Sequence, residues 1–328
     1  MKILIVGFGS IGKRHLENLL SKTNSEIIVY SKRTDLNSLN KKNIKIFNSL
    51  ERCLSEKPDI GFITNETAYH IPVAIKLAKS GLDLFIEKPL SNSIENIIVL
   101  KNLVRQKKLI TQMGFNFRFH DAIKKIRQSI KERKIGRIIS VQVEHSSHLP
   151  DWHPYEDYKK GYAAKKDLGG GVVLTQSHEL DYLYWFFGYP ETVFSVTGKF
   201  SDLKISTDDL STSIIKFKND IIAQIHLSFF QGPEYRSCKI KGTKGTIFWN
   251  SESNEVKMYD NKKKRWSVLL KLIKFERNQM YVDEIKHFLN CVKKRKKTIN
   301  DLEEGIKTMK IALAIKKSAE NEKKIKLN

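Results

Sequence analysis

The chain has 328 residues, of which 40% are hydrophobic and 29% are charged, and this length and composition predict a globular protein of two domains. Its formal net charge is +23, but the basic runs are short and are not interleaved with the aromatic side chains on which bases stack. We therefore expect solvated basic surfaces and no nucleic-acid partner, with nucleic-acid binding as the less favoured alternative. No apolar run approaches the roughly 18 residues of a membrane span, so no membrane partner is expected.

The cysteines favour neither a disulfide framework nor a zinc site. Cys53, Cys238 and Cys291 are odd in number, far apart and in no C-x-x-C pair. We expect no metal site. The first predicted strand begins at Lys2 and leaves no room for a signal peptide, so the expected location is the cytoplasm.

The first 20 residues have the pattern of a nucleotide-binding unit. Residues 2–6 are an apolar run that predicts a buried parallel strand, and residues 10–20 have helical spacing. A G-x-G-x-x-G motif lies between them, and in this context it indicates a tight turn that brings a pyrophosphate to the start of the helix. The expected cofactor contacts here are Gly7, Gly9, Ser10, Ile11 and Gly12.

The second predicted strand, residues 25–30, bears on the choice of cofactor. NAD sites usually have an acidic residue at the end of this strand, but here it is followed by Ser31, Lys32 and Arg33. A hydroxyl and two cations favour a 2′-phosphate, and therefore NADP over NAD. In the alternative interpretation, Asp35 binds the ribose and these three are ordinary loop residues.

Strand and helix patterns continue to alternate up to residue 119. This alternation is typical of an α/β domain with a doubly wound parallel sheet, whose ligands bind at the carboxyl ends of the strands. Further strands are predicted at 43–49, 59–65, 83–90 and 109–119. The helix predicted at 92–108 has Ile94, Ile97, Ile98 and Leu100 on its apolar side. At the strand ends we expect the cofactor to contact Thr64, Asn65, His70, Glu87 and Lys88, and the substrate to contact Asn116 and Arg118.

From residue 120 the pattern changes to that of an α+β domain, which we assign to residues 120–328. An amphipathic helix precedes a strand, and the later strand candidates are separated by short turns, which predicts a largely antiparallel sheet with one face left for partner contacts. Strands are predicted at 138–147, 192–200, 210–218, 221–230 and 237–250, an edge hairpin at 254–260 and around Trp266, and helices at 280–292 and 302–320.

A loop rich in aromatic and polar residues opens this second domain. Flat aromatic rings with polar tips suit a sugar, whose faces are apolar and whose rim carries hydroxyls. The expected substrate contacts are Trp152, His153, Tyr155 and Tyr158. In the alternative interpretation, the aromatic residues only anchor a surface loop.

Three glycines, 169–171, then introduce a mostly apolar segment that predicts one helix over residues 172–187. Thr175, His178 and Asp181 recur every three residues and would share one face of it. A histidine between a hydroxyl and a carboxylate is a candidate general acid or base. The alternative is a structural histidine in the core.

Several motifs resemble the glucose–fructose oxidoreductase/inositol dehydrogenase/rhizopine catabolism (Gfo/Idh/MocA) family. They are GFGSIGKRH, TNETAYH, LFIEKPL, GFNFRF, and GGG followed by SHELDYLYWFFG, and the similarity runs nearly end to end. The resemblance implies an N-terminal Rossmann domain, a C-terminal open-faced sheet, NAD(P) chemistry on sugars, and a homo-oligomer. It also implies that Lys88 is the catalytic lysine and His178 the catalytic histidine.

The chain departs from the family at one position. The family commonly has D-x-G-x-H, but Leu174 stands where the Asp would be, and Glu179 or Asp181 are candidates to replace it. Our main interpretation is an NADP-preferring oxidoreductase of a sugar or nucleotide sugar, in the synthesis of surface glycans or sialic-acid-like sugars. The alternative is a protein of the same fold that binds the cofactor without turnover, as a sensor or assembly subunit.

Overall fold

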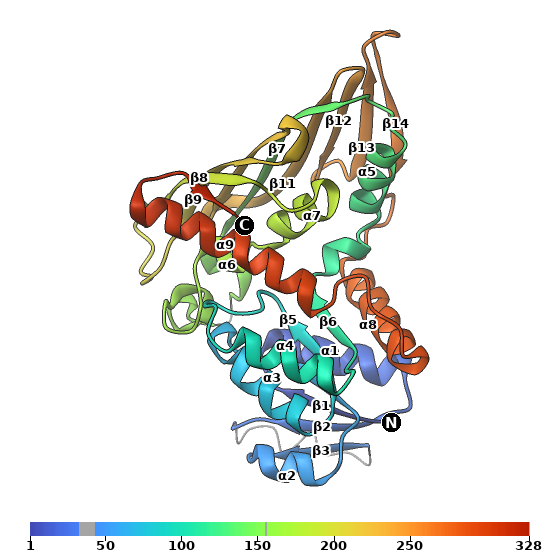
Figure 1. The fold of residues 1–328 in the computed structure, drawn as a ribbon, viewed down its shortest axis with the longest axis vertical. Coiled ribbons are helices and arrows are strands. Elements are labelled where there is room, and N and C mark those ends of the chain that lie inside the picture. Colours follow the sequence, from blue (N-terminus) through green and yellow to red (C-terminus); the bar gives the residue numbers. More distant parts are fainter. Residues whose placement is uncertain (33–42, 155, 328) are drawn as a thin grey trace. The chain divides into compact units, whose positions relative to one another are not determined.

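The computed structural model describes residues 1–32, 43–154 and 156–327 (Figure 1). They form two compact units. The first unit is Met1–Phe115 with Asn278–Ile306, and the second is Asn116–Arg277 with Lys307–Asn328. The expected domains, 1–119 and 120–328, stay a prediction; the units differ from them because residues 278–306 pack with the N-terminal residues.

Within the described residues, the first unit contains a six-stranded sheet in the order β3-β2-β1-β4-β5-β6, and all of its pairs are parallel. The strand order reverses between β1 and β4, and it is outside the carboxyl ends of the strands at such a switch point that ligands bind. The α/β prediction is thus confirmed. The strands are β1 (Lys2–Val6), β2 (Glu26–Tyr30), β3 (Ile44–Phe47), β4 (Ile60–Ile63), β5 (Asp83–Glu87) and β6 (Thr111–Gly114).

Helices cover this sheet because its strands are apolar on both sides. Leu16 and Leu19 of one helix, with Ile285 and Phe288 of another, join Ile3 of β1 in one buried cluster. The helices of this unit are α1 (Ser10–Lys22), α2 (Leu50–Ser55), α3 (His70–Lys79), α4 (Ile97–Gln106) and α8 (Arg277–Lys294), with the short turn η2 (Thr67–Tyr69).

The buried side of α4 is narrower than expected. Ile97 and Leu100 are buried, but the side chains of Ile94 and Ile98 are 69% and 74% exposed, so their assignment to the apolar side was wrong. Asn96 has a left-handed backbone (φ 57°) and the helix begins after it, which leaves Ile94 outside the helix. Ile98 follows Ile97 by one position, about 100° around the helix, and therefore faces solvent.

Among the described residues, the second unit contains a nine-stranded sheet in the order β14-β13-β12-β11-β7-β10-β9-β8-β15. The β7–β10 pair is parallel and the other neighbouring strands of this sheet pair antiparallel, so the sheet is largely antiparallel, as the sequence predicts. The strands are β7 (Ile138–His148), β8 (Thr192–Gly198), β9 (Leu210–Lys216), β10 (Ile222–Ser228), β11 (Phe230–Gly242), β12 (Gly245–Asn250), β13 (Glu255–Asp260), β14 (Arg265–Lys271) and β15 (Ile325–Lys326). The edge hairpin is confirmed as β13–β14, whereas 237–250 is a hairpin and not one strand.

One helix prediction of this unit was wrong. The segment 172–187 forms two helices, α6 (Val172–Thr175) and α7 (His178–Phe187), because Gln176 has a non-helical backbone (φ −95°, ψ 39°). Thr175 and His178 therefore do not share a helical face, and His178 is the first residue of α7. The other helical segments are η3 (Asn116–Phe119), α5 (Asp121–Lys131), η4 (Leu149–Trp152), η5 (Tyr158–Lys160), η6 (Tyr162–Ala164), η7 (Lys218–Asp220) and α9 (Leu302–Asn321).

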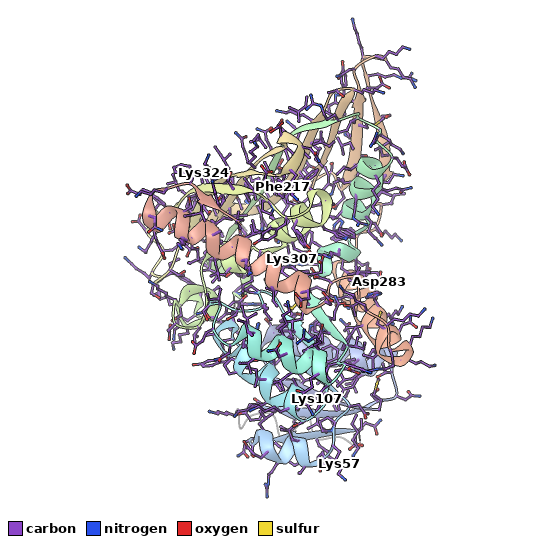
Figure 2. All side chains as sticks on the ribbon, in the orientation of Figure 1. Lys57, Lys107, Phe217, Asp283, Lys307 and Lys324 are labelled. Carbon is purple, nitrogen blue, oxygen red and sulfur yellow. The ribbon has the colours of Figure 1, made fainter. Side chains whose placement is uncertain are left out.

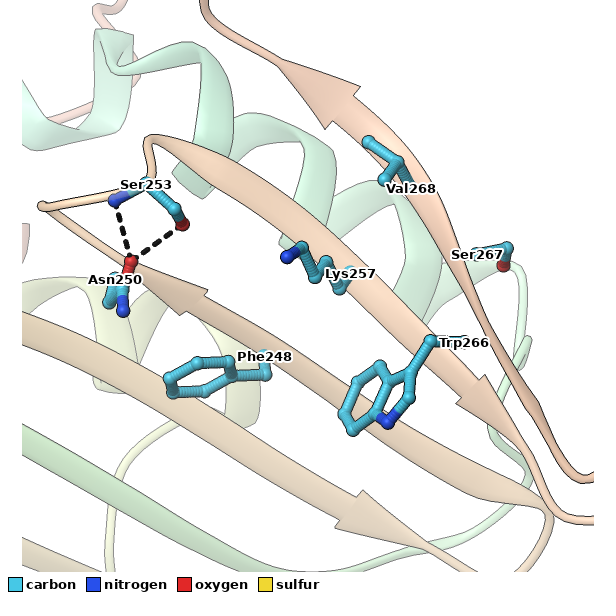
Figure 3. A pocket seen from close by; sticks show the side chains of 7 residues that line it. All are labelled: Phe248, Asn250, Ser253, Lys257, Trp266, Ser267 and Val268. Carbon is cyan, nitrogen blue, oxygen red and sulfur yellow. Dashed lines mark hydrogen bonds between the residues drawn. The ribbon is translucent and has the colours of Figure 1, made fainter.

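One face of the second sheet is open and carries two hollows. The first, about 520 Å³, lies over β7, β9, β10 and β11 and includes Gln142, Gln224 and Lys239. The second, about 470 Å³, lies between Phe248 of β12 and Trp266 of β14, with Lys257 of β13 between them (Figure 3).

Part of the positive net charge of the chain comes from lysines that are exposed to solvent. Lys57, Lys107 and Lys324 are exposed and lie outside the helices and strands, after α2, after α4 and before β15, respectively (Figure 2). This distribution fits the interpretation of solvated basic surfaces.

Candidate active site

The glycine turn between β1 and α1 is shaped by close backbone packing. Gly7 has a positive φ of 95°, and a Cβ on it would lie 2.6 Å from Asn65 Cα. A Cβ on Gly12 would lie 2.4 Å from the carbonyl oxygen of Gly7. By contrast, no described atom lies within 4 Å of a Cβ placed on Gly9. The turn is therefore packed at its two ends and open in the middle, which fits the close approach of a pyrophosphate.

The start of α1 also fits an anion. Gly9 is its N-cap and offers no side-chain acceptor, and Ser10 and Ile11 lie in the first turn. The N–H groups of a first helical turn have no intrahelical acceptors and favour negative charge. A dinucleotide would be held here by the backbone from Gly7 to Gly12.

The end of β4 packs against this turn. Thr64 is 4% exposed, and its hydroxyl donates to the carbonyl oxygen of Gly7 at 2.7 Å. His70 is 1% exposed, with Nε2 at 2.9 Å from the carbonyl oxygen of Asn65 and Nδ1 at 2.8 Å from that of Pro89. Burial holds the pKa of His70 below its usual value, although the two carbonyls oppose this. Two expected cofactor residues, Thr64 and His70, thus hold backbone around the turn.

The end of β5 brings Glu87 and Lys88 to the same edge of the sheet. Glu87 Oε1 lies 2.7 Å from His15 Nε2 of α1, and Oε2 accepts the backbone N–H of Lys88 at 3.2 Å. Gly114 of β6 is the strand partner of Glu87, and a Cβ on Gly114 would come within 2.8 Å of the Glu87 carboxylate. The Lys88 side chain is half-buried.

His15 is a residue that the sequence analysis missed. It is fully buried, with 0% exposure, and lies three positions after Gly12 in GFGSIGKRH. Since residues three apart share a helical face, and Gly12 is the glycine that packs on the strand, this spacing was a usable signal.

The adenosine end of the predicted site is only partly described. Ser31 is buried and its N–H donates to the carbonyl oxygen of Phe47, while Lys32 is exposed. Arg33 and Asp35 lie outside the described residues, as does Tyr155. The choice between NADP and NAD therefore stays a prediction.

In the second unit, Arg118 and Asp181 form a buried bidentate ion pair. Arg118 Nε lies 2.9 Å from Asp181 Oδ2, and Nη2 lies 2.8 Å from Oδ1. Their exposures are 1% and 0%, and the Thr308 hydroxyl is 3.2 Å from Asp181 Oδ1. An expected substrate contact and an expected catalytic residue are thus paired, and they join η3 to α7. Asn116, also expected to contact substrate, is a buried residue of η3.

His178 contacts another residue of η3, Phe117. It is 7% exposed, and its ring centroid is 5.0 Å from that of Phe117. The Arg236 guanidinium lies 4.4 Å from the centroid of the same Phe117 ring. Thr175, 3% exposed, lies in α6, one helix earlier.

A cluster of charged residues lies beside His178. Glu179 is 1% exposed, with Arg236 Nη1 at 3.1 Å and His145 Nδ1 at 3.5 Å, and His145 Nε2 is 3.4 Å from Glu234. Burial acts to raise the pKa of Glu179, but Arg236 and His145 more than offset it, so the net direction is down. Both candidate replacements for the family's Asp, Glu179 and Asp181, are therefore paired with arginines.

The aromatic loop is attached to its own unit. Trp152 Nε1 donates to the Ser147 hydroxyl at 3.0 Å, and the Tyr158 hydroxyl accepts the N–H of Lys204 at 3.2 Å. Ser147 also accepts from Gln176 at 3.2 Å, and Gln176 occupies the Gly position of the family's D-x-G-x-H pattern. His153 is half-buried. These contacts match the anchoring interpretation, and the contact of the loop with a substrate stays a proposal.

In residues 1–32, 43–154 and 156–327, no group of three or more His, Cys, Asp or Glu side chains could hold a metal ion. Nor does this part contain a helix with the length and apolar character needed to cross a membrane.

The charged cluster predicts a pH dependence of stability. The hydrogen bond from His145, with Arg236 and Arg277 nearby, lowers the pKa of Glu234 from 4.5 to about 2. A carboxyl whose pKa is lower in the folded state stabilises it above the unfolded pKa, and this contribution disappears as the pH falls through the folded value. The urea midpoint of unfolding should therefore fall as the pH is lowered from about 5 to about 2, and less steeply in Glu234→Gln. Exposed Glu252→Gln is the control; equal pH slopes in the two variants would contradict the assignment.

Two family models match the chain. Residues 1–115 match the oxidoreductase family's NAD-binding Rossmann fold, and residues 127–327 match its C-terminal alpha/beta domain. Myo-inositol 2-dehydrogenase of Thermotoga maritima is 26% identical over 343 residues, covering 100% of this chain and 98% of that protein. Levoglucosan dehydrogenase of Pseudarthrobacter phenanthrenivorans is 24% identical over 232 residues, covering 62% and 59%.

Solved structures share the fold over the whole chain. Levoglucosan dehydrogenase in complex with NADH has a TM-score of 0.88 at 17% identity, covering 100% of this chain and 99% of that one. Myo-inositol 2-dehydrogenase from Lactobacillus plantarum has a TM-score of 0.83 at 20% identity, with coverage of 100% and 99%. Since the two family models together span most of the sequence, the chain belongs to the Gfo/Idh/MocA oxidoreductase family.

Proposed function

We propose that this protein is an NAD(P)-dependent oxidoreductase that transfers a hydride between a nicotinamide cofactor and a hydroxyl or carbonyl group of a sugar or nucleotide sugar. The observation that carries the proposal is the open glycine turn at the switch point of the parallel sheet, in the same unit as Lys88. Sugar and cyclitol dehydrogenases among the relatives support the substrate class, including glucose-6-phosphate 3-dehydrogenase of Bacillus subtilis, 22% identical over 253 residues.

A narrower proposal concerns the pathway. We keep the synthesis of surface glycans or sialic-acid-like sugars as the metabolic context. A relative named 2,7-anhydro-N-acetylneuraminate hydratase, from Escherichia coli, is 25% identical over 250 residues, covering 74% of this chain and 66% of that protein, and it supports this choice. The cytoplasmic location likewise stays a prediction.

The proton chemistry is assigned to Lys88 and His178. Oxidation of a carbinol requires removal of its hydroxyl proton, and the reverse reaction requires its delivery. The bound nicotinamide supplies the hydride acceptor or donor. Lys88 would bind and polarise the reacting oxygen, and His178, whose imidazole can accept or donate a proton, would take or return the proton. The backbone from Gly7 to Gly12 would hold the pyrophosphate.

Asp181 has a supporting role in this proposal. Both of its carboxylate oxygens accept from Arg118, so we assign the pair to holding α7, and with it His178, on η3. Thr175, the last residue of α6, and Asn116, the first residue of η3, are buried near the same elements and remain proposed site residues. Trp152, His153, Tyr155 and Tyr158 remain the proposed substrate contacts of the aromatic loop.

The catalytic proposal predicts two losses of turnover. Lys88→Ala and His178→Ala should each lower kcat by about 10²- to 10⁴-fold, because each removes a positioned acid or base, while the Kd for the reduced cofactor changes little. Absorbance at the nicotinamide band, with a panel of sugars and cyclitols and both oxidised cofactors, measures kcat. Exposed Lys101→Ala is the control. Near-full turnover in both variants would show that the assignment is wrong.

The alternative function rests on one observation, the Leu at position 174 where the family has Asp. A sensor or assembly protein would bind the reduced cofactor but turn over no member of the panel. The same two measurements, cofactor binding and turnover by the unmodified protein, separate the two functions.

The cofactor proposal is a preference for NADP over NAD. If Ser31, Lys32 and Arg33 hold a 2′-phosphate, NADPH should bind more tightly than NADH, and Arg33→Ala should remove about 10- to 100-fold of that preference, as expected for a charge-assisted pair. Fluorescence titration of both reduced cofactors measures it. Equal affinities in the unmodified protein would refute NADP preference.

We also propose a homo-oligomer formed through the open face of the second sheet. Phe194, Val196 and Ile214 are 42%, 55% and 47% exposed there, and Trp266 and Val268 are 51% and 54% exposed. Exposed apolar surface of this extent is typical of a protein interface. A second copy of the same face would cover it.

Light scattering after gel filtration tests this interface. The unmodified protein should have a mass that is a multiple of 38.0 kDa, and Ile214→Asp should shift it towards 38.0 kDa, because the new charge would be buried without a partner. A monomer at all micromolar concentrations would contradict the proposal.

A further inference from the structure

His15 is a buried titratable residue to which the proposed chemistry assigns no role. It lies in α1 with no exposed surface and packs against the rings of Phe62 and Phe85, at centroid distances of 5.4 and 5.0 Å. Its Nε2 atom is 2.7 Å from Glu87 Oε1, 72 residues away in the sequence. Such a contact inside an aromatic cluster requires a physical reason.

The reason lies in the carboxylate of Glu87. This residue is 7% exposed, and a buried carboxylate is costly unless hydrogen-bond donors satisfy it. The two donors seen are the Nε2–H of His15 and the backbone N–H of Lys88. Nδ1 of His15 has no hydrogen-bond partner among the described residues. Nε2 is therefore the ring nitrogen through which His15 serves the carboxylate.

Lys88 is therefore fixed on both sides. On the N-terminal side, His15 holds Glu87, whose second oxygen holds the Lys88 N–H. On the C-terminal side, His70 holds the carbonyl oxygen of Pro89. Gly114 leaves room for the carboxylate over β6, so that Glu87 can lie flat against the neighbouring strand.

We propose that His15 is a positioning residue for Lys88. Through the carboxylate of Glu87 it connects α1, whose first turn would bind the pyrophosphate, to the backbone that directs the Lys88 amine. One buried hydrogen bond then fixes the position of the Lys88 backbone relative to the cofactor-binding turn. This inference rests on the proposed catalytic role of Lys88.

The test compares variants of His15 with a matched control on the same strand. His15→Leu removes the donor, and His15→Gln keeps an N–H near the position of Nε2. The control is Arg295→Gln, which removes the partner of the buried Asp83 carboxylate at the opposite end of β5. Lys88→Ala is measured in parallel.

Two readouts are used for every variant. The first is the rate at which acetic anhydride labels the Lys88 amine, followed by peptide mass spectrometry, which requires no substrate. The second is kcat on myo-inositol and on the other sugars and cyclitols of the panel, together with the Kd for NADH.

In His15→Leu, we expect acetic anhydride to label the Lys88 amine faster and kcat to fall about 100-fold, because a small misplacement of a reacting group has an effect of this size. The Kd for NADH should be nearly unchanged. His15→Gln should recover most of both values. Arg295→Gln should lower the thermal stability of the protein without changing the Lys88 labelling rate or kcat. If His15 had a purely structural role, His15→Leu and Arg295→Gln would have the same Lys88 labelling rate and the same kcat.

The outcomes separate the two claims. If Lys88→Ala is inactive while His15→Leu matches Arg295→Gln in labelling and kcat, the positioning role is refuted. If Lys88→Ala keeps its turnover, the proposed catalytic role of Lys88 fails, and the labelling rate alone decides whether His15 holds Lys88. If His15→Leu does not fold, Glu87→Gln replaces it, because its amide leaves one of the two donors without an acceptor and should also raise labelling and lower kcat.

Discussion

A carboxylate that is buried at the end of a strand must be hydrogen-bonded, and this requirement organises the first unit. Glu87 receives N–H groups from His15 and Lys88, and Gly114 makes space for it. As a result, the helix behind the glycine turn, the end of β5 and the start of the Lys88 segment form one hydrogen-bonded structure. A lysine on an otherwise flexible stem therefore starts from a fixed backbone, which is what positioned proton transfer requires.

The second unit meets the same requirement with arginines. Arg118 neutralises Asp181, and Arg236 neutralises Glu179, so the two acidic residues of α7 are both paired. Breaking a buried pair by removing one partner typically costs about 3–5 kcal/mol, so both pairs restrict how far α7 can move. His178 is the first residue of this helix and packs on the Phe117 ring. The two candidates to replace the family's Asp, Asp181 and Glu179, are thus both engaged with arginines.

The sequence predicted the sheets better than the site. The parallel sheet, the glycine turn and the edge hairpin follow from local patterns of two to six residues, which is why they were confirmed. The break at Gln176 was not predictable, because apolar residues on both sides of it continue the helical spacing. The His15–Glu87 pair joins residues 72 positions apart, and no local pattern encodes that distance. Ile94 and Ile98 were misassigned because the start of α4 depends on the backbone of Asn96.

We propose that Lys88, held by Glu87, acts on a substrate beside the nicotinamide of a dinucleotide whose pyrophosphate binds the glycine turn. A crystal structure of the protein with NADPH or NADH bound tests this proposal directly. We expect the pyrophosphate on the backbone from Gly7 to Gly12, the nicotinamide ring beside the Lys88 amine, and the His15–Glu87 hydrogen bond intact. A nicotinamide ring remote from Lys88, or a Glu87 carboxylate turned away from His15, would contradict it.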